Sequence, residues 1–578
     1  MGENAAATGA TVALASSFML YRLYQSILPK PIPGIAYDEA AAKSPLGDLP
    51  AMLRQNTGST MDWIAKRARQ HNDPLCQLFL QPLSQPMLVL SDFRESQDIL
   101  MRRSREWDRT DWSIEIFKGV VPEHHINLKL GDQWKTQRRL LQDLMSPEFL
   151  NNVAGPNIWA STKTLLTLWA EKARIADGRA FSVVDDIYYV ALDAVLAFSF
   201  GTAFPHRSLV PQLKLLQDLG DKSLEHTKNE NPQDVAVFKE APLDETLQAT
   251  LHISTQVGAA LQNVSVSLSY FMQGFSSSNR KLRKAREQQI YNEIAKAVAR
   301  RQQQEKGREA EVRSAVDLMV DRETWLAEKE GRKPEYFSPV MRDEVMGFVV
   351  AGHDTSSTTL LWGLKLLADH PESQKKLKEA LLAGHPAAAA EERLPTAHEI
   401  ASTNIPYLSA VIEEVLRCGC TVPALERQCN QDTMVLGHPV PKGTMMLLLS
   451  TGPSFNEPRF EVKEELRNES CRAAGQDRQW DPEGMDQFRP ERWLKEEDGE
   501  IVFDSTAGPT LPFGLGLRGC FGRRLAYLEL RIIITLLFWS FDEFMKCPEH
   551  LSSYEAVDEI THKPKMCYVK LKTKQTGA

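Results

Sequence analysis

Apolar residues recur at helical spacing along most of the chain, and this pattern predicts a mainly helical protein. Helical patterns dominate from residue 146 to residue 390, where residues 181–200 are apolar enough to predict a buried helix. Periodicity and capping signals predict the other main helices, which are 60–71, 92–101, one opened by Gly131-Asp132, 280–308, 338–368 and 406–417. A last helix is predicted after residue 522, with one apolar face made of Leu525, Leu528, Ile532 and Leu536.

Short apolar or alternating runs predict a small β region. Residues 76–80 and 87–90 are separated by prolines and predict a hairpin. Strands and turns are also predicted at 436–450, and a last strand at 564–571. Residues 105–128 are predicted to form an apolar-rich loop. Variable helices are predicted at 205–275, and a surface loop or helix end at 387–390. Periodicity by itself therefore predicts a mostly helical protein.

The composition is that of an ordinary globular protein and narrows the range of partners. The chain has 578 residues, 42% hydrophobic and 25% charged, with a net charge of −8. This balance does not suggest a nucleic-acid partner. Residues 280–308 are rich in lysine and arginine and could form a nucleic-acid arm, but mixed signs at helical spacing favour a solvated surface helix.

The eight cysteines are scattered and do not resemble a disulfide framework. Cys418, Cys420 and Cys429 lie close together in sequence, but no nearby histidine pair completes a zinc site. We interpret them as reduced structural cysteines in a domain that faces the cytosol.

The N-terminus predicts a marginal membrane anchor at residues 1–28. Residues 4–21 carry no charge, yet only a few of them are strongly apolar, whereas a bilayer span needs about 20 mainly apolar residues. No basic segment precedes the run, which argues against a cleaved signal peptide. A proline-rich hinge at 29–50 follows, and a disordered tail is the alternative interpretation.

A glycine-rich loop, Pro512 to Gly522, carries the strongest chemical signal. It places Cys520 near a helix N-terminus, where unpaired N–H groups favour a thiolate over a thiol. A lone cysteine is usually a buried structural residue. Here, however, the loop reads F-G-x-G-x-R-x-C-x-G, and its fixed positions are Phe513, Gly514, Gly516, Arg518, Cys520 and Gly522.

This loop resembles the heme-binding loop of the cytochrome P-450 family. The resemblance implies that Cys520 is the axial thiolate ligand of heme iron and that Arg518 contacts a heme propionate. Trp134 and Arg138 match the W-x-x-x-R motif of the family, whose two members donate hydrogen bonds to a propionate. Arg427 stands ten residues after Arg417, which matches the spacing of a further propionate-binding arginine.

The helix at 338–368 contains the sequence A-G-H-D-T, which resembles the oxygen-handling motif of the family. The resemblance implies that a widened turn makes room for oxygen and that Asp354 and Thr355 deliver protons to it. A glycine-kinked packing helix with a polar spot is the alternative interpretation.

Glu414 and Arg417 lie three residues apart on one helix face and could form a surface pair of little energetic weight. The family instead implies a buried E-x-x-R pair that is joined by the arginine of a P-E-R segment. That residue is Arg492 here, and the three residues would form a structural lock.

The resemblance covers nearly all of residues 29–572 and implies a mainly α fold with a small β region, in a single large heme domain at 51–578. It implies heme b with an axial thiolate, O₂ as co-substrate, and electrons from NADPH through a flavoprotein reductase. The activity would insert one oxygen atom into a small organic, biosynthetic substrate. The insertion at 468–480 resembles fungal members of the family. The short anchor followed by a proline-rich hinge resembles membrane-bound eukaryotic members, which implies the endoplasmic reticulum membrane with the catalytic domain facing the cytosol.

The reductase of this family docks on the thiolate side of the heme. Basic residues that the resemblance places there are Lys135, Arg139, Arg523 and Arg524. Two other functions stay open: a heme-thiolate isomerase or dehydratase that needs no reductase, and a heme sensor that is not an enzyme. Isomerases and dehydratases often lose the acid–alcohol pair, which this chain keeps as Asp354 and Thr355.

Overall fold

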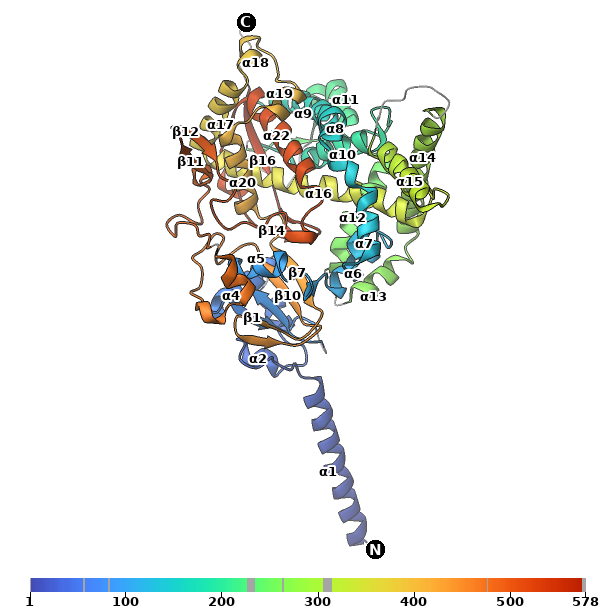
Figure 1. Ribbon diagram of the computed structural model, residues 1–578, viewed down its shortest axis with the longest axis vertical. Coiled ribbons are helices and arrows are strands. Elements are labelled where there is room, and N and C mark those ends of the chain that lie inside the picture. The colour runs from blue at the N-terminus through green and yellow to red at the C-terminus, as the bar shows by residue number, and fades with distance from the viewer. Residues whose placement is uncertain are drawn as a thin grey trace. The chain divides into compact units, whose positions relative to one another are not determined.

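A computed structural model describes residues 2–55, 58–81, 84–225, 234–261, 263, 265–304, 314–475 and 477–573 (Figure 1). Helices dominate, as the sequence predicts. The chain forms two compact units. The first comprises residues 1–110, 423–478 and 515–518, and the second comprises 111–422, 479–514 and 519–578.

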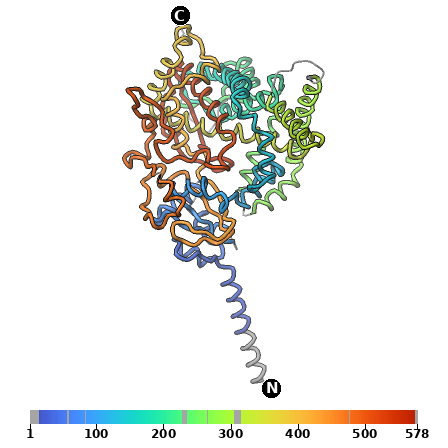
Figure 2. Tube along the Cα trace, viewed as in Figure 1, coloured from blue at the N-terminus to red at the C-terminus, as the bar shows by residue number. Residues whose placement is uncertain are grey.

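The first unit is built around a five-stranded sheet in the order β1-β2-β10-β7-β3. Its strands are β1 (Leu75–Leu78), β2 (Met87–Leu90), β3 (Trp107–Asp108), β7 (Ala424–Cys429) and β10 (Met445–Leu449). β1 and β2 form the predicted antiparallel hairpin, and β10 pairs with β2 in parallel. The blue and orange segments that meet in this sheet are far apart in sequence but lie side by side (Figure 2). A buried cluster that includes Trp63, Val89 and Leu447 packs on the sheet.

The other elements of the first unit are α1 (Gly2–Ile27), α2 (Glu39–Ala42), α3 (Leu49–Gln55), α4 (Thr60–His71), α5 (Phe93–Met101), α21 (Glu469–Ala474), the 3-10 helices η5 (Glu464–Leu466) and η7 (Gly516–Arg518), and the strands β8 (Thr433–Val435) and β9 (His438–Val440). α4 has the predicted bounds, and Asp92 caps α5 through a hydrogen bond from the Glu95 N–H of 2.7 Å. In the described part of the chain no helix, α1 included, has both the length and the apolarity that a membrane crossing requires. This finding does not support the predicted transmembrane anchor.

The second unit is mostly helical. Its helices are α6 (Asp111–Lys118), α7 (Asp132–Leu140), α8 (Pro147–Phe149), α9 (Gly155–Ala176), α10 (Val184–Phe200), α11 (Leu209–Leu219), α12 (Glu245–Leu261), α13 (Val266–Gln273), α14 (Ser277–Gln304), α15 (Ala315–Glu330), α16 (Pro339–Asp369), α17 (Pro371–Gly384), α18 (Pro386–Ala390), α19 (Ala397–Ser402), α20 (Pro406–Gly419) and α22 (Arg523–Ser540). Short helical turns are η1 (His125–Asn127), η2 (Gln142–Met145), η3 (Leu150–Ala154), η4 (Gly220–Ser223), η6 (Pro490–Trp493) and η8 (Glu549–Leu551). α9, α10, α16 and α22 bury the main apolar core against one another.

The strands of the second unit are β4 (Phe181–Ser182), β5 (Leu224–Glu225), β6 (Val237–Phe238), β11 (Leu494–Glu497), β12 (Glu500–Phe503), β13 (Phe541–Met545), β14 (Ala556–Asp558), β15 (His562–Pro564) and β16 (Tyr568–Thr573). β13, β16 and β4 form a small sheet, and the other strands form two-stranded ribbons.

The structure corrects several boundaries. Residues 105–128 were expected to form a loop, but they contain β3, α6 and η1, because the large apolar side chains of this stretch pack into the core and order the backbone. The expected last strand at 564–571 is replaced by β15 and β16 with a break between them. Residues 387–390, expected to be a surface loop or a helix end, make up all but the first residue of the short helix α18. Residues 305–308 of the predicted surface helix lie outside the described residues.

Candidate active site

Cys520 lies where the glycine-rich loop meets α22. Its backbone N–H donates to the Phe513 carbonyl at 2.7 Å, which closes the loop, and Gly522 is the N-cap of α22. The Phe513 ring packs on the Tyr527 ring, with 5.1 Å between centroids, and fixes the loop to the helix. All eight cysteines lie in the described part of the chain, and Cys520 alone is exposed. It is therefore the cysteine best placed to bind an external group.

Two glycines of the loop have distinct reasons to lack a side chain. Gly516 has φ +67°, and a Cβ there would lie 2.1 Å from the Leu100 carbonyl oxygen, so no other residue fits. A Cβ at Gly522 would meet no protein atom within 4 Å. Its missing side chain keeps the space next to Cys520 clear, which suits the close approach of a flat ligand.

The electrostatic surroundings of Cys520 are mixed. Although the residue is accessible, neighbouring protein atoms desolvate the sulfur and raise the pKa of the thiol, while the Gly522 N–H and the positive charges of Arg138 and Arg523 oppose this rise. The helix N-terminus alone therefore does not produce the thiolate that the sequence predicts. A coordinated metal ion would, because it deprotonates a thiol outright.

Trp134 and Arg138 share one face of α7, as predicted from their spacing. The Arg138 guanidinium lies over the Trp134 ring at 5.3 Å and over the Phe521 ring at 4.6 Å. Phe521 follows Cys520 directly, so this stack positions the arginine beside the loop that carries the thiol. Cation–π contacts of this kind hold a guanidinium in place without neutralising its charge.

Three arginines, Arg109, Arg427 and Arg518, lie close together in the first unit, where two acids only partly balance their positive charge. Burial and the Arg518 charge lower the pKa of Arg109 to about 10, and burial with the charges of Arg109 and Arg518 lowers the pKa of Arg427 to about 10. Asp108 accepts from Arg518 at 2.7 Å, and Glu426 is the other nearby acid. Such a crowded, desolvated set of guanidiniums is suited to two added carboxylates, as a heme has.

Arg427 and Arg518 were predicted from motifs, but Arg109 was not. It lies in the stretch 105–128, which has no periodicity and no motif, and only the pairing of β3 with β7 brings it to Arg427. The sequence feature that comes nearest to indicating Arg109 is its position directly after Asp108, the acid that accepts hydrogen bonds from Arg518.

The polar pair of α16 is anchored to different partners. The Asp354 carboxylate is buried and accepts from the Thr561 hydroxyl at 3.0 Å, and that hydroxyl also lies 2.8 Å from Thr358 Oγ1. The Thr355 hydroxyl donates to the Ala351 carbonyl at 2.8 Å. α16 is a continuous α-helix here, without the widened turn that the sequence suggested.

Gly352 serves helix packing in this arrangement. A Cβ at this position would lie 2.8 Å from a methyl group of Val195 on α10, so glycine lets the two helices approach closely. The polar groups of the motif are thereby held in a tight apolar environment, where fixed hydrogen bonds are strong.

A second acid touches α16 from α22. The Ser356 hydroxyl donates to the Glu529 carboxyl group at 2.5 Å, and complete burial raises the pKa of Glu529 to about 8. This carboxyl group therefore keeps its proton at neutral pH. Sequence reasoning missed it, although its position on the apolar helix after Cys520 marks it as an unusual acid.

Glu414, Arg417 and Arg492 form the predicted buried lock. The Arg417 guanidinium donates to both carboxylate oxygens of Glu414, at 2.7 and 2.8 Å, and Arg492 Nε donates at 3.0 Å. Burial acts to raise the pKa of Glu414, but the two arginines outweigh it and lower that pKa. The Trp493 indole N–H, which the sequence did not indicate, also donates to Glu414 at 2.9 Å.

A cluster of His124, His125 and Glu344 fastens η1 to α16 and was not predicted. His125 donates its backbone N–H to Glu344 at 2.7 Å, and its Nδ1 lies 2.7 Å from the same carboxylate. Although three such groups could hold a metal ion, His124 Nδ1 accepts the Ile126 N–H, so Nε2 carries the proton of the neutral ring. Gly347 leaves room for this ring, because a Cβ there would lie 2.2 Å from it. We interpret the cluster as a hydrogen-bonded anchor.

Comparisons with known proteins identify the family. The family model for cytochrome P-450 matches residues 51–461 and 478–570. The cytochrome P-450 monooxygenase TRI13 of Fusarium sporotrichioides is 40% identical over 96% of this chain and 97% of its own. Similar relatives are the cytochrome P-450 monooxygenases GME11363 of Pestalotiopsis microspora, 37% identical over 97% of both chains, and xilC of Penicillium rubens, 36% identical over 98% of this chain and 96% of its own.

The fold agrees with this relationship. The crystal structure of the cytochrome P-450DA heme domain superposes with a TM-score of 0.64 and covers 95% of this chain and 99% of that one, at 18% identity. The predicted likeness to fungal members is confirmed by the relatives above. The chain is an oxidoreductase that belongs to the cytochrome P-450 family, a family of heme-thiolate proteins.

Proposed function

We propose that this protein is a heme-thiolate monooxygenase that inserts one oxygen atom of O₂ into a small organic substrate. The observation that carries the proposal is the Cys520 loop. It joins the family motif to the single exposed cysteine of the chain, with a clear space beside it at Gly522. Cys520 would hold heme b through its thiolate, and the bound heme would supply the oxygen-activating redox chemistry.

The protein side of cofactor binding is electrostatic. Arg427, Arg518 and Arg109 would hold the heme carboxylates, because added negative charge would relieve their mutual repulsion and desolvation. Trp134 and Arg138 contribute hydrogen-bond donors next to the loop of Cys520. Phe513, Gly514 and Gly522 shape that loop.

Proton supply is the task of α16. Asp354 holds a fixed orientation through Thr561, and Thr355 presents a hydroxyl beside it. Because the two side chains are bonded to different partners, the acid can stay buried and fixed while the hydroxyl is free to serve the reacting group. General acid catalysis requires this kind of positioned donor.

Electrons come from NADPH through a flavoprotein reductase. Lys135, Arg139, Arg523 and Arg524 are exposed and positively charged on a chain of net charge −8. A local basic surface attracts and orients an acidic partner. The side chain of Arg523 lies over the Phe513 and Tyr527 rings, which places this charge next to the Cys520 loop.

The substrate is a small biosynthetic intermediate of secondary metabolism. The support is that a fungal relative, 40% identical over 280 residues, is named as the cytochrome P-450 monooxygenase of the Hps1-dma1 cluster of Dothistroma septosporum.

The location proposed is the endoplasmic reticulum membrane, with the catalytic part facing the cytosol. Residues of α1 leave large apolar side chains exposed, among them Leu14, Phe18 and Met19. A helix with such side chains gains free energy by entering the interfacial region of a bilayer. Removal of residues 1–28 should release the protein from microsomes, and retention would contradict this location.

The decisive experiment compares the wild type with Cys520→Ala. The wild type should show the red-shifted Soret band of a thiolate-ligated heme in its reduced carbon monoxide complex, and the variant should lose it. NADPH consumption with a reductase, followed beside product analysis, separates the three functions. A monooxygenase couples electron use to oxygenated product, an isomerase or dehydratase turns over without electrons, and a sensor yields no product.

A further inference from the structure

A short segment outside the family pattern is fixed to α5. Residues 462–477 are not matched by the family model, and within them η5 and α21 lie against α5. Arg467 donates to both carboxylate oxygens of Asp92, at 2.7 and 2.9 Å, and both side chains are almost completely buried. Because Asp92 also caps α5, this pair ties the segment to the start of the helix.

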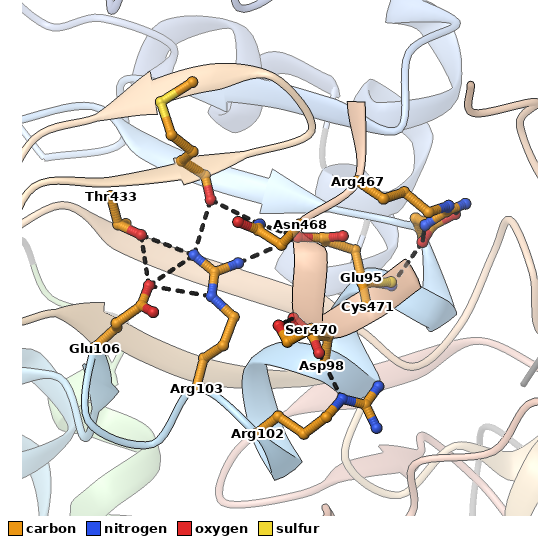
Figure 3. Close-up of polar contacts among 12 residues, drawn as sticks. Glu95, Asp98, Arg102, Arg103, Glu106, Thr433, Arg467, Asn468, Ser470 and Cys471 are labelled. Carbon is orange, nitrogen blue, oxygen red and sulfur yellow. Dashed lines mark hydrogen bonds and ion pairs between the residues drawn. The ribbon is translucent and has the colours of Figure 1, made fainter. Parts of the chain in front are cut away.

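The next two acids on the same face of α5 bind the same segment (Figure 3). Asn468 donates to Glu95 at 2.8 Å, and Ser470 donates to Asp98 at 2.7 Å. Asp92, Glu95 and Asp98 are three residues apart in sequence, so they form one stripe along the helix. Burial raises the pKa of Glu95, and the strongest opposing contribution comes from Asn468. The segment thus supplies partners to a row of buried acids.

Arg103, which follows α5, extends the network toward β3 (Figure 3). It donates to Glu95 at 3.2 Å and to Glu106 at 2.8 Å, and its side chain is 3% exposed. It also donates to Thr433 Oγ1 at 2.7 Å and to the Met434 carbonyl at 2.8 Å. Asn468 donates to that same carbonyl at 3.0 Å, so the segment and Arg103 share an acceptor.

The other end of this network contacts the segments that carry Asp108 and Arg518, and Arg518 is one of the proposed heme-binding arginines. The Leu100 carbonyl at the end of α5 is the atom that a Cβ on Gly516 would strike, so α5 sets the position of η7. Glu106 immediately precedes β3, whose Asp108 holds Arg518 through two hydrogen bonds of 2.7 and 3.1 Å. The end of α5 and the strand β3 therefore both contact the loop that carries Arg518.

We propose that residues 464–474 act as a brace, in which Arg467, Asn468 and Ser470 position the cofactor arginines Arg518 and Arg109 through α5 and β3. The inference rests on the proposed heme binding. These three are positioning residues, since they act through Asp92, Glu95 and Asp98. Without these donors Asp92 would lose its bidentate partner, while Glu95 would keep Arg103 and Asp98 would keep Arg102. The less fully compensated acids would draw water, and the helix would lose its fixed orientation.

The test measures heme retention in the full-length heme-loaded protein. Arg467→Gln removes the bidentate contact and Ser470→Ala removes one donor, while Arg472→Gln makes the same charge change on an exposed residue of α21. We expect Arg467→Gln to release heme to excess apomyoglobin about tenfold faster or more, as loss of a charged hydrogen bond would cause. Ser470→Ala should show a smaller effect, Arg472→Gln none, and Arg467→Lys partial rescue.

The reduced carbon monoxide spectrum separates positioning from general destabilisation. At a temperature below the unfolding transition seen by circular dichroism, Arg467→Gln should lose part of the thiolate-type Soret band while its helix content is unchanged. Equal heme release rates in Arg467→Gln, Ser470→Ala and the wild type would overturn the brace while leaving heme binding intact. If a variant lost heme only in step with its helix content, the segment would be a general stabiliser and the proposal would be wrong. A wild type without a thiolate-type band would reject the proposed function itself.

Discussion

Arg492 donates a hydrogen bond of 3.0 Å to Glu414, although 78 residues separate the two in sequence. The same carboxylate oxygen accepts from Arg417 and from the Arg489 backbone N–H, so several donors surround one buried charge. Removal of any partner leaves the rest of the network with an uncompensated charge in a medium of low polarity.

Glu414→Ala and Arg492→Ala should each lower the free energy of unfolding by about 3–5 kcal/mol and reduce heme incorporation more than catalysis. Because both side chains belong to one network, the double variant should lose clearly less than the sum of the single losses. Urea unfolding of the four proteins measures this coupling. Strict additivity would show that the two residues are energetically independent.

Arg109→Gln should weaken heme retention, because it removes one of the three guanidiniums that can neutralise the heme carboxylates. Loss of one charged hydrogen bond predicts heme transfer to apomyoglobin that is about tenfold faster. Arg105→Gln, an exposed arginine four residues earlier, is the matched control. If Arg109→Gln retained heme as well as the control, Arg109 would not contact the cofactor.

Thr561→Val should impair proton delivery in the same way as Asp354→Asn, since the Thr561 hydroxyl holds the Asp354 carboxylate at 3.0 Å. We expect slower turnover in both variants, and more peroxide or water formed per NADPH in both of them, as in Thr355→Ala. Thr561→Ser should restore coupling, and Thr324→Val, at a buried threonine of α15, should leave it unchanged. Normal coupling in Thr561→Val would exclude this residue from the proton route.

Glu529 should make the folded state less stable as the pH rises. Burial raises its pKa from 4.5 to about 8, so between these values the unfolded chain releases this proton while the native chain keeps it. The free energy of unfolding then falls by up to about 1.4 kcal/mol per pH unit within that window. Glu529→Gln cannot ionise and should show a flatter dependence in urea unfolding from pH 5 to pH 8.

The exposed residue Glu549 provides the control for this measurement. Glu549→Gln should follow the wild-type dependence. If the difference between wild type and Glu529→Gln did not change with pH, Glu529 would be ionised in the native state and the assigned proton would be absent.

Reversal of charge at Arg523 should slow reduction by the reductase without changing the spectra of substrate binding. Arg523 and Arg524 are both exposed, but Arg524 also donates to the Met145 carbonyl at 3.3 Å, so we expect the larger effect for Arg523→Glu. The rate should fall as salt rises, because exposed charges are screened beyond about 10 Å at 0.1 M salt. Lys296→Glu on α14 is the control, and a rate independent of both salt and Arg523 would remove this surface from the mechanism.

The sequence alone determined the helical class, the main helices and the family motif of the Cys520 loop. These signals are local, since a helix face repeats every 3.6 residues and the heme-loop motif spans ten consecutive positions. The caps at Asp92 and Ser338 were also local, because each side chain bonds to an N–H three residues ahead. Glu414, Arg417 and Arg492 were recognised from their motifs, although their contact joins distant segments.

Tertiary structure decided what no local pattern contains. Arg109 reaches Arg427 only because β3 pairs with β7, more than 300 residues away. Residues 105–128 gain order from packing rather than from periodicity, and the segment 464–474 gains its role from buried acids on α5. The energy of a buried charge depends on which distant groups surround it, and the fold alone brings those groups together.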